Sequence, residues 1–98
     1  MKLNLGCGNK KLNGYINIDQ TEYCNPDLLL NLENTPYPFK SSTIEEIIMN
    51  SVIEHLPSRP EDFFRILKEI YRIMKNQAEL KILCPHPFHR WQIVDFTH

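Results

Sequence analysis

A short apolar stretch, Leu3–Leu5, runs directly into two glycines, Gly6 and Gly8, with Cys7 between them. Glycine adopts backbone angles that other residues avoid, so a strand with this ending can turn sharply and offer bare main chain to a ligand. In open α/β sheets, ligands bind in the crevice at the carboxyl ends of the strands. An ordinary glycine turn is the competing interpretation, because a lone Gly-x-Gly is a weak signal.

A carboxylate ends the next apolar run. Tyr15–Asp19 alternates with a period of two and is rich in β-forming residues, which predicts a second strand that closes on Asp19. An acid at this place can accept two hydrogen bonds from a ribose diol. Its distance from Gly6 is shorter than the spacing of about 20 residues in dinucleotide-binding folds, and a solvated Asp at a turn is the alternative.

Short apolar runs between polar or proline-containing segments supply the elements that would position these residues. The five expected strands cover residues 3–5, 15–19, 28–32, 44–50 and 80–84. Periodicity alone leaves a buried helical turn open for the third run. The fourth run is apolar on both faces, which is typical of strands in a parallel sheet.

One helix is predicted between the last two strands. Ser58 and Glu61 have the spacing of a capping box, which places the N-cap at Ser58. Apolar and charged residues then fall on opposite helical faces as far as Asn76 and Gln77, where we expect the helix to end. A parallel α/β sheet in a single domain, residues 1–98, is the architecture that this order predicts.

Composition excludes several classes of function. The 98 residues carry a net charge of −1, so they lack the basic excess of a nucleic-acid-binding surface. No apolar run is long enough for a membrane span or a signal peptide. The three scattered cysteines indicate reduced thiols rather than a disulfide framework. We expect a soluble cytoplasmic protein with no nucleic-acid or membrane partner.

Three motifs in the right order resemble the class I S-adenosylmethionine-dependent methyltransferases. They are Leu3–Asn9, Gly14–Asp19 and Ser51–Leu56. The sequence is most similar to the type 11 branch and its relatives that lack the first helix, and the resemblance covers nearly the whole chain. It implies a Rossmann-like, open, mainly parallel sheet of order 3-2-1-4-5 with few helices.

The resemblance also implies S-adenosylmethionine as cofactor. Gly6 and Gly8 would hold its methionine end and Asp19 its ribose hydroxyls. Asn31 and Leu32 fall where the family usually has an Asp-Leu pair near the adenine amino group, and Asn can accept that bond through its amide oxygen. The expected cofactor-binding residues are Gly6, Cys7, Gly8, Asp19, Asn31, Leu32, Asn50 and Ser51.

His55 is the candidate catalytic residue, because Glu54 and His55 match a Glu-His pair of the family. A neutral His could act as a general base near physiological pH. A structural role, in which the ring bonds to backbone at the lip of the sheet, is the alternative. Methyl transfer needs little acid–base help, since the sulfonium already carries the leaving group and alignment does much of the work.

A zinc site at Cys84, His86 and His89 is a further possibility from spacing. The chain has no second ligand pair, so we expect no metal.

The expected function is methyl transfer from S-adenosylmethionine to a small-molecule acceptor. The alternative is a non-catalytic, truncated module that binds the nucleotide. Family domains continue through two further strands, whereas this sequence stops soon after the fifth and its tail has no alternating pattern. We therefore expect the fifth strand to be an exposed edge, prone to self-association. The short link at residues 9–14 should leave one sheet face thinly covered.

Overall fold

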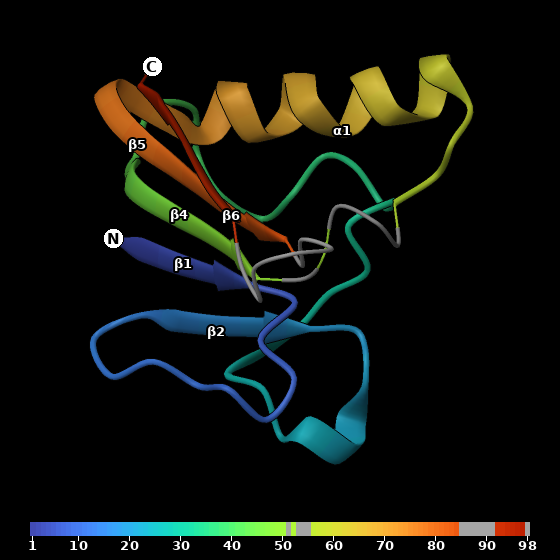
Figure 1. Ribbon diagram of the computed structural model, residues 1–98, viewed down its shortest axis with the longest axis vertical. Helices are drawn as coiled ribbons and strands as arrows, with labels where there is room; N and C mark the ends of the chain where they lie inside the picture. Colours follow the sequence, from blue (N-terminus) through green and yellow to red (C-terminus); the bar gives the residue numbers. More distant parts are fainter. Residues whose placement is uncertain (51, 53–55, 85–91, 98) are drawn as a thin grey trace.

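The computed structural model describes residues 1–50, 52, 56–84 and 92–97. Its elements are mostly strands joined by loops, with a long helix along the top of the view in Figure 1. In chain order they are β1 (Lys2–Leu5), β2 (Ile16–Asp19), the 3-10 turn η1 (Glu22–Cys24), β3 (Leu28–Leu29), β4 (Ile44–Asn50), α1 (Pro60–Ile73), β5 (Met74–Cys84) and β6 (Gln92–Thr97).

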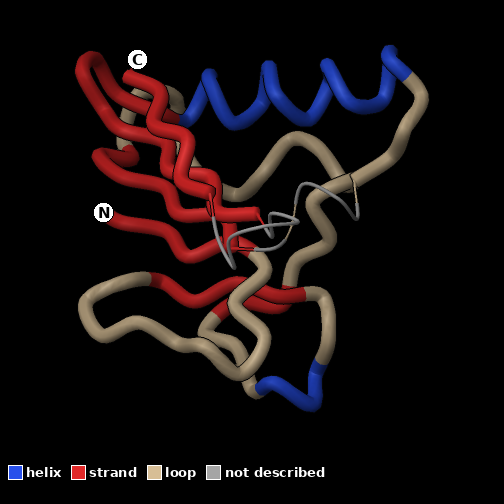
Figure 2. Tube along the Cα trace, in the orientation of Figure 1, coloured by secondary structure: helices blue, strands red, loops and turns tan. Residues whose placement is uncertain are grey.

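The strands form one sheet in the order β3-β2-β1-β4-β5-β6. β1 to β5 are all parallel, which confirms the Rossmann-like sheet of order 3-2-1-4-5 with few helices. Figure 2 shows the single long helix beside the strands. Within the described segments, no helix has the length and apolar character that crossing a membrane requires.

The core lies between α1 and one face of the central strands. Leu3 pairs with Ile47 and Leu5 with Met49, so these four buried side chains share a face. The helix contributes Ile66, Ile70 and Ile73 to the same buried cluster. Burial of a Leu or Ile side chain stabilises a fold by about 1.5–3 kcal/mol, so this seam holds β1, β4 and α1 together.

The helix starts one residue later and ends earlier than the sequence predicts. Its N-cap is Arg59, which makes no side-chain cap bond, so the capping box at Ser58 is wrong. Pro60 explains the difference, because proline suits the first helical position and holds the preceding residue extended. At the other end, the amide of Thr43 bonds to the carbonyl of Ile73 at 2.9 Å, and Met74 already belongs to β5.

Two strands, β3 and β5, differ from their predicted ranges by more than one residue. β5 is longer, because Met74 pairs with Ile44 before a register shift brings Glu79 opposite Glu46. β3 is shorter than residues 28–32. The amide of Leu30 still bonds to the carbonyl of Asp19 at 2.9 Å, but the chain then turns away.

The tail forms a strand, contrary to the expectation of an irregular segment. β6 pairs antiparallel with β5 along residues 79–84, so β5 is not the edge of the sheet and that expectation is wrong. An unpaired edge offers hydrogen-bonding groups to any segment within reach. Residues 92–97 include Ile93, Val94 and Phe96, which are good β formers even without alternation.

The link between β1 and β2 contains no helix, yet the face beside it is covered. In Figure 1 the link is the wide blue loop that passes below β2. Asn4 and Asn17 pair across the two strands and are 2% and 6% exposed. The side-chain amide of Asn4 donates to the carbonyl of Lys10 and to Asn17 Oδ1, both at 2.9 Å. The expectation of a thinly covered face is therefore wrong at this point.

Candidate functional site

A pocket of about 200 Å³ opens at the carboxyl ends of β1, β2 and β3. Parallel strands all deliver the residues that follow them to this edge of a sheet. The pocket is lined by Gly6, Ile18, Asp19, Gln20, Leu30, Asn31, Leu32, Glu33, Val52 and Leu56. Four residues singled out in the sequence, Gly6, Asp19, Asn31 and Leu32, thus lie around one cavity.

Asp19 ties the glycine loop to the end of β2. Its Oδ2 accepts a hydrogen bond from the Gly8 amide at 2.9 Å, and its Oδ1 accepts one from the Thr21 amide at 2.9 Å. A carboxylate offers about four acceptor positions. Both oxygens therefore keep capacity for a further donor from a ligand in the pocket.

Gly6 is required by packing as well as by backbone conformation. Its φ is +65°, and a Cβ placed there would lie 2.3 Å from Cγ2 of Val52. Val52 is buried and lines the same pocket. Val52 lies within the Ser51–Leu56 motif, but no local sequence pattern indicates that it contacts Gly6.

Gly8 has a different environment. Its φ is +51°, and a Cβ there would meet no atom within 4 Å. Its amide is already used by Asp19. The conformation of the loop therefore depends on glycine at both positions, whereas the tight contact occurs only at Gly6.

Cys7, between the two glycines, has a buried side chain. It is 4% exposed, it is not among the pocket-lining residues, and its amide donates to the carbonyl of Ile18 at 2.9 Å. Burial, followed by the charge of Asp19, raises the pKa of its thiol above 9.0. The thiol therefore stays protonated at neutral pH and packs as a small apolar side chain.

The wall formed by Asn31 and Leu32 begins with a side-chain turn. Asn31 Oδ1 accepts a hydrogen bond from the Glu33 amide at 2.9 Å. Asn side chains commonly form such a turn with the backbone two residues further along. The amide nitrogen of Asn31 is a further donor beside the cavity. Leu30, Leu32 and Leu56 pack partly against the core and give the pocket its apolar surface.

The remaining predicted residues are Asn50, Ser51 and His55. Asn50 ends β4 but is not among the lining residues. Ser51 and His55 lie outside the described residues, as do His86 and His89. Within the part of the chain that the structure describes, no three His, Cys, Asp or Glu side chains are grouped closely enough to hold a metal ion.

No protein-family model and no curated protein matches the chain. Its fold does match solved structures. One is the crystal structure of a candidate S-adenosyl-L-methionine-dependent methyltransferase from Methanococcus maripaludis, with a TM-score of 0.60 and 16% sequence identity. The chain has the fold of that protein. The match covers 83% of this chain and 46% of the other, so this chain spans less than half its length.

Proposed function

We propose that the pocket at the carboxyl edge of the sheet binds S-adenosylmethionine. The chain is then the cofactor-binding part of a methyltransferase of the type 11 kind, active in the cytoplasm on a small-molecule acceptor. One observation carries the proposal: Gly6, Asp19, Asn31 and Leu32, chosen from the sequence alone, line a single cavity.

The residues present suit the nucleoside half of this cofactor. Asp19 has acceptor capacity for ribose hydroxyls, and Asn31 carries an amide beside the cavity. Leu30 and Leu32 supply apolar walls for a base. At the other end, the space beside Gly6 is taken by Val52, so the methionine end would contact that side chain rather than bare backbone.

When bound, the cofactor supplies a methyl group on a positively charged sulfur, from which a nucleophile displaces it. The contribution of the chain is alignment, because a well-placed nucleophile and methyl group need no strong acid or base. His55 remains our candidate for a base toward an acidic acceptor, with Asn50 and Ser51 on the methionine side.

The alternative is a module that holds the cofactor without catalysis. The structural match spans 46% of the M. maripaludis protein, and activity is not shared by every part of an enzyme. Detection of methyl transfer to any acceptor in a panel of small nucleophiles separates the two functions. Tight binding without turnover supports the module.

Calorimetric titration with S-adenosylhomocysteine tests the proposed site. Asp19→Ala should weaken binding by about 1.5–3 kcal/mol, the range for hydrogen bonds to a charged group. Asp62→Ala is the matched control, because Asp62 lies on α1 in surface ion pairs and outside the pocket. Equal affinity of the parent and Asp19→Ala would remove Asp19 from the site.

A further inference from the structure

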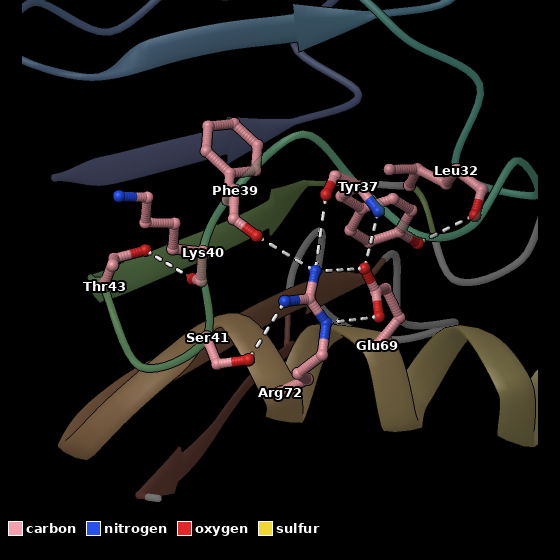
Figure 3. Close-up of polar contacts among 8 residues, drawn as sticks. All are labelled: Leu32, Tyr37, Phe39, Lys40, Ser41, Thr43, Glu69 and Arg72. Atoms are coloured by element: carbon pink, nitrogen blue, oxygen red, sulfur yellow. Dashed lines mark hydrogen bonds and ion pairs between the residues drawn. The ribbon is translucent and has the colours of Figure 1, made fainter.

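An ion pair between two residues of α1, Glu69 and Arg72, faces the loop that precedes β4 (Figure 3). Arg72 donates two hydrogen bonds to the Glu69 carboxylate, from Nε to Oε1 at 2.8 Å and from Nη2 to Oε2 at 2.6 Å. Glu69 is only 8% exposed, and its Oε2 also accepts the Tyr37 amide at 2.5 Å. We call Tyr37, Glu69 and Arg72 the clamp.

The clamp holds the loop by its backbone. Nη2 of Arg72 donates to the carbonyls of Phe39 at 3.0 Å and Tyr37 at 3.3 Å, and Nη1 donates to Ser41 Oγ at 3.1 Å. The hydrogen bonds from Arg72 lower the pKa of Glu69 below its usual value, so the pair is ionised at neutral pH. A bidentate ion pair on a buried carboxylate, with its hydrogen bonds satisfied, gives a rigid, geometrically specific contact.

The clamp reaches the pocket through one hydroxyl group. The Tyr37 side chain is 3% exposed, and its hydroxyl donates to the carbonyl of Leu32 at 2.7 Å. Burial raises the pKa of Tyr37, which keeps the hydroxyl a donor at any physiological pH. A continuous set of bonds therefore runs from α1 through Tyr37 to the wall of the pocket.

Other bonds around this wall shape the turn without fixing its place to the same degree. Asn31 bonds to the amides of Glu33 and Asn34, both within the turn itself. Arg65 on α1 donates to the Glu33 carbonyl at 3.3 Å, a longer bond made by an exposed side chain. The bond from the buried Tyr37 hydroxyl to the Leu32 carbonyl, at 2.7 Å, is shorter than the Arg65 bond. Tyr37 in turn is held to the helix through its amide, which donates to Glu69.

We infer that Tyr37 is a positioning residue, which sets the place of the Asn31–Leu32 wall and so the selectivity of the pocket for its nucleobase. The inference rests on the function proposed above. Loss of the hydroxyl should let the wall move, and the recognition of the base should then weaken while the ribose contact at Asp19 remains.

Titration with two ligands tests this role. S-adenosylhomocysteine and S-inosylhomocysteine differ at the base, so the ratio of their affinities reports on the wall. Tyr37→Phe should lower that ratio by about 3- to 10-fold, as expected for the loss of one neutral hydrogen bond. Tyr23→Phe is the matched control, since Tyr23 is 99% exposed, and it should keep the parent ratio. A general loss of stability would weaken both ligands alike.

The outcomes separate the inference from the proposed function. A parent that binds neither ligand overturns the function itself. A parent that binds both equally, or a folded Tyr37→Phe with the parent ratio, overturns the inference and leaves the function standing. If circular dichroism shows Tyr37→Phe to be unfolded, Arg72→Lys takes its place. That variant keeps a cation beside Glu69 but loses the planar fork, and it should lower the ratio in the same direction. An unchanged ratio in folded Arg72→Lys would overturn the inference.

Discussion

Single residues at the pocket serve the fold and the proposed ligand at once. Asp19 holds the amides of Gly8 and Thr21 and still faces the cavity. Gly6 permits a left-handed backbone and leaves room for Val52. Variants of these residues therefore need controls that separate a loss of fold from a loss of binding.

Gly6→Ala should destabilise the protein by about 2–4 kcal/mol, because it adds left-handed strain to an overpacked contact with Val52. Gly14→Ala is the control, with φ +86° and open space around its Cα, and it should cost only about 1–2 kcal/mol from strain. Urea unfolding measures both. Adding Val52→Ala should relieve part of the cost at Gly6, and strict additivity of the two changes would contradict the contact.

Tyr15 should ionise late. Its hydroxyl donates to Glu46, and this hydrogen bond is the main reason that its pKa rises from 10.0 to about 12. A raised folded pKa means that the stabilisation is complete below pH 10 and is lost as the pH rises toward 12. Ultraviolet titration of the parent against Tyr15→Phe isolates this phenol. A difference spectrum that titrates near pH 10 would contradict the bond.

At the scale of elements, an asparagine takes over the covering role of a helix between β1 and β2. Oδ1 of Asn17 accepts the Leu12 amide at 2.8 Å, and its Nδ2 donates to the Leu12 carbonyl at 3.2 Å. Asp27 binds both the backbone and the side chain of Asn17 from the next loop. The link is therefore fastened to the sheet by polar bonds rather than by an apolar face.

Asn17→Ala should destabilise the protein by about 2–4 kcal/mol, because the buried Asn4 amide and the half-buried Leu12 amide lose their bonds to its side chain. Asn13→Ala, at an exposed position in the same link, should change stability by less than about 0.5 kcal/mol. Urea unfolding gives the values, and hydrogen exchange at the Leu12 amide should quicken only in Asn17→Ala. Retained protection at Leu12 would show that the link is held elsewhere.

At the scale of the whole molecule, the clamp makes the free energy of unfolding depend on pH in the acid range. Glu69 has a lowered pKa in the folded state, so its contribution is full above about 4.5, its unfolded value, and is lost as the pH falls through the folded pKa. We expect the urea midpoint to decrease as the pH falls below 4.5, and this decrease should be smaller in Glu69→Gln. Glu61→Gln, on the exposed end of α1, should show the same decrease at acid pH as the parent. If the decrease at acid pH is as large in Glu69→Gln as in the parent, other carboxylates cause it.

At the scale of the whole chain, β6 covers the edge of β5 through which the sequence predicts self-association. Self-association through the fifth strand was expected from an open edge, but β5 is paired on both sides. We predict that the double variant Val94→Pro/Asp95→Pro associates, because consecutive strand residues point alternate amides toward β5 and one of these ladder bonds must be lost. Sedimentation velocity should show larger species for this variant than for the parent. Identical profiles would mean that an exposed β5 does not drive association.

The sequence by itself determined the strands at β1, β2 and β4, the single helix, and which residues stand at strand ends. These features are local: periodicity, glycine and proline act over a few neighbouring residues. With the parallel order that the resemblance implied, strand ends must meet at one edge, which is why Gly6, Asp19, Asn31 and Leu32 could be named in advance.

Only the tertiary structure decided the rest, because the deciding contacts join residues far apart in the chain. Val52 fills the space at Gly6, and Glu69 reaches the amide of Tyr37, 32 residues away. β6 exists because β5 offers it a ladder of hydrogen bonds, not because its own pattern demands a strand. Interactions of this kind depend on where the folded backbone brings two groups together, and no local spacing encodes that distance.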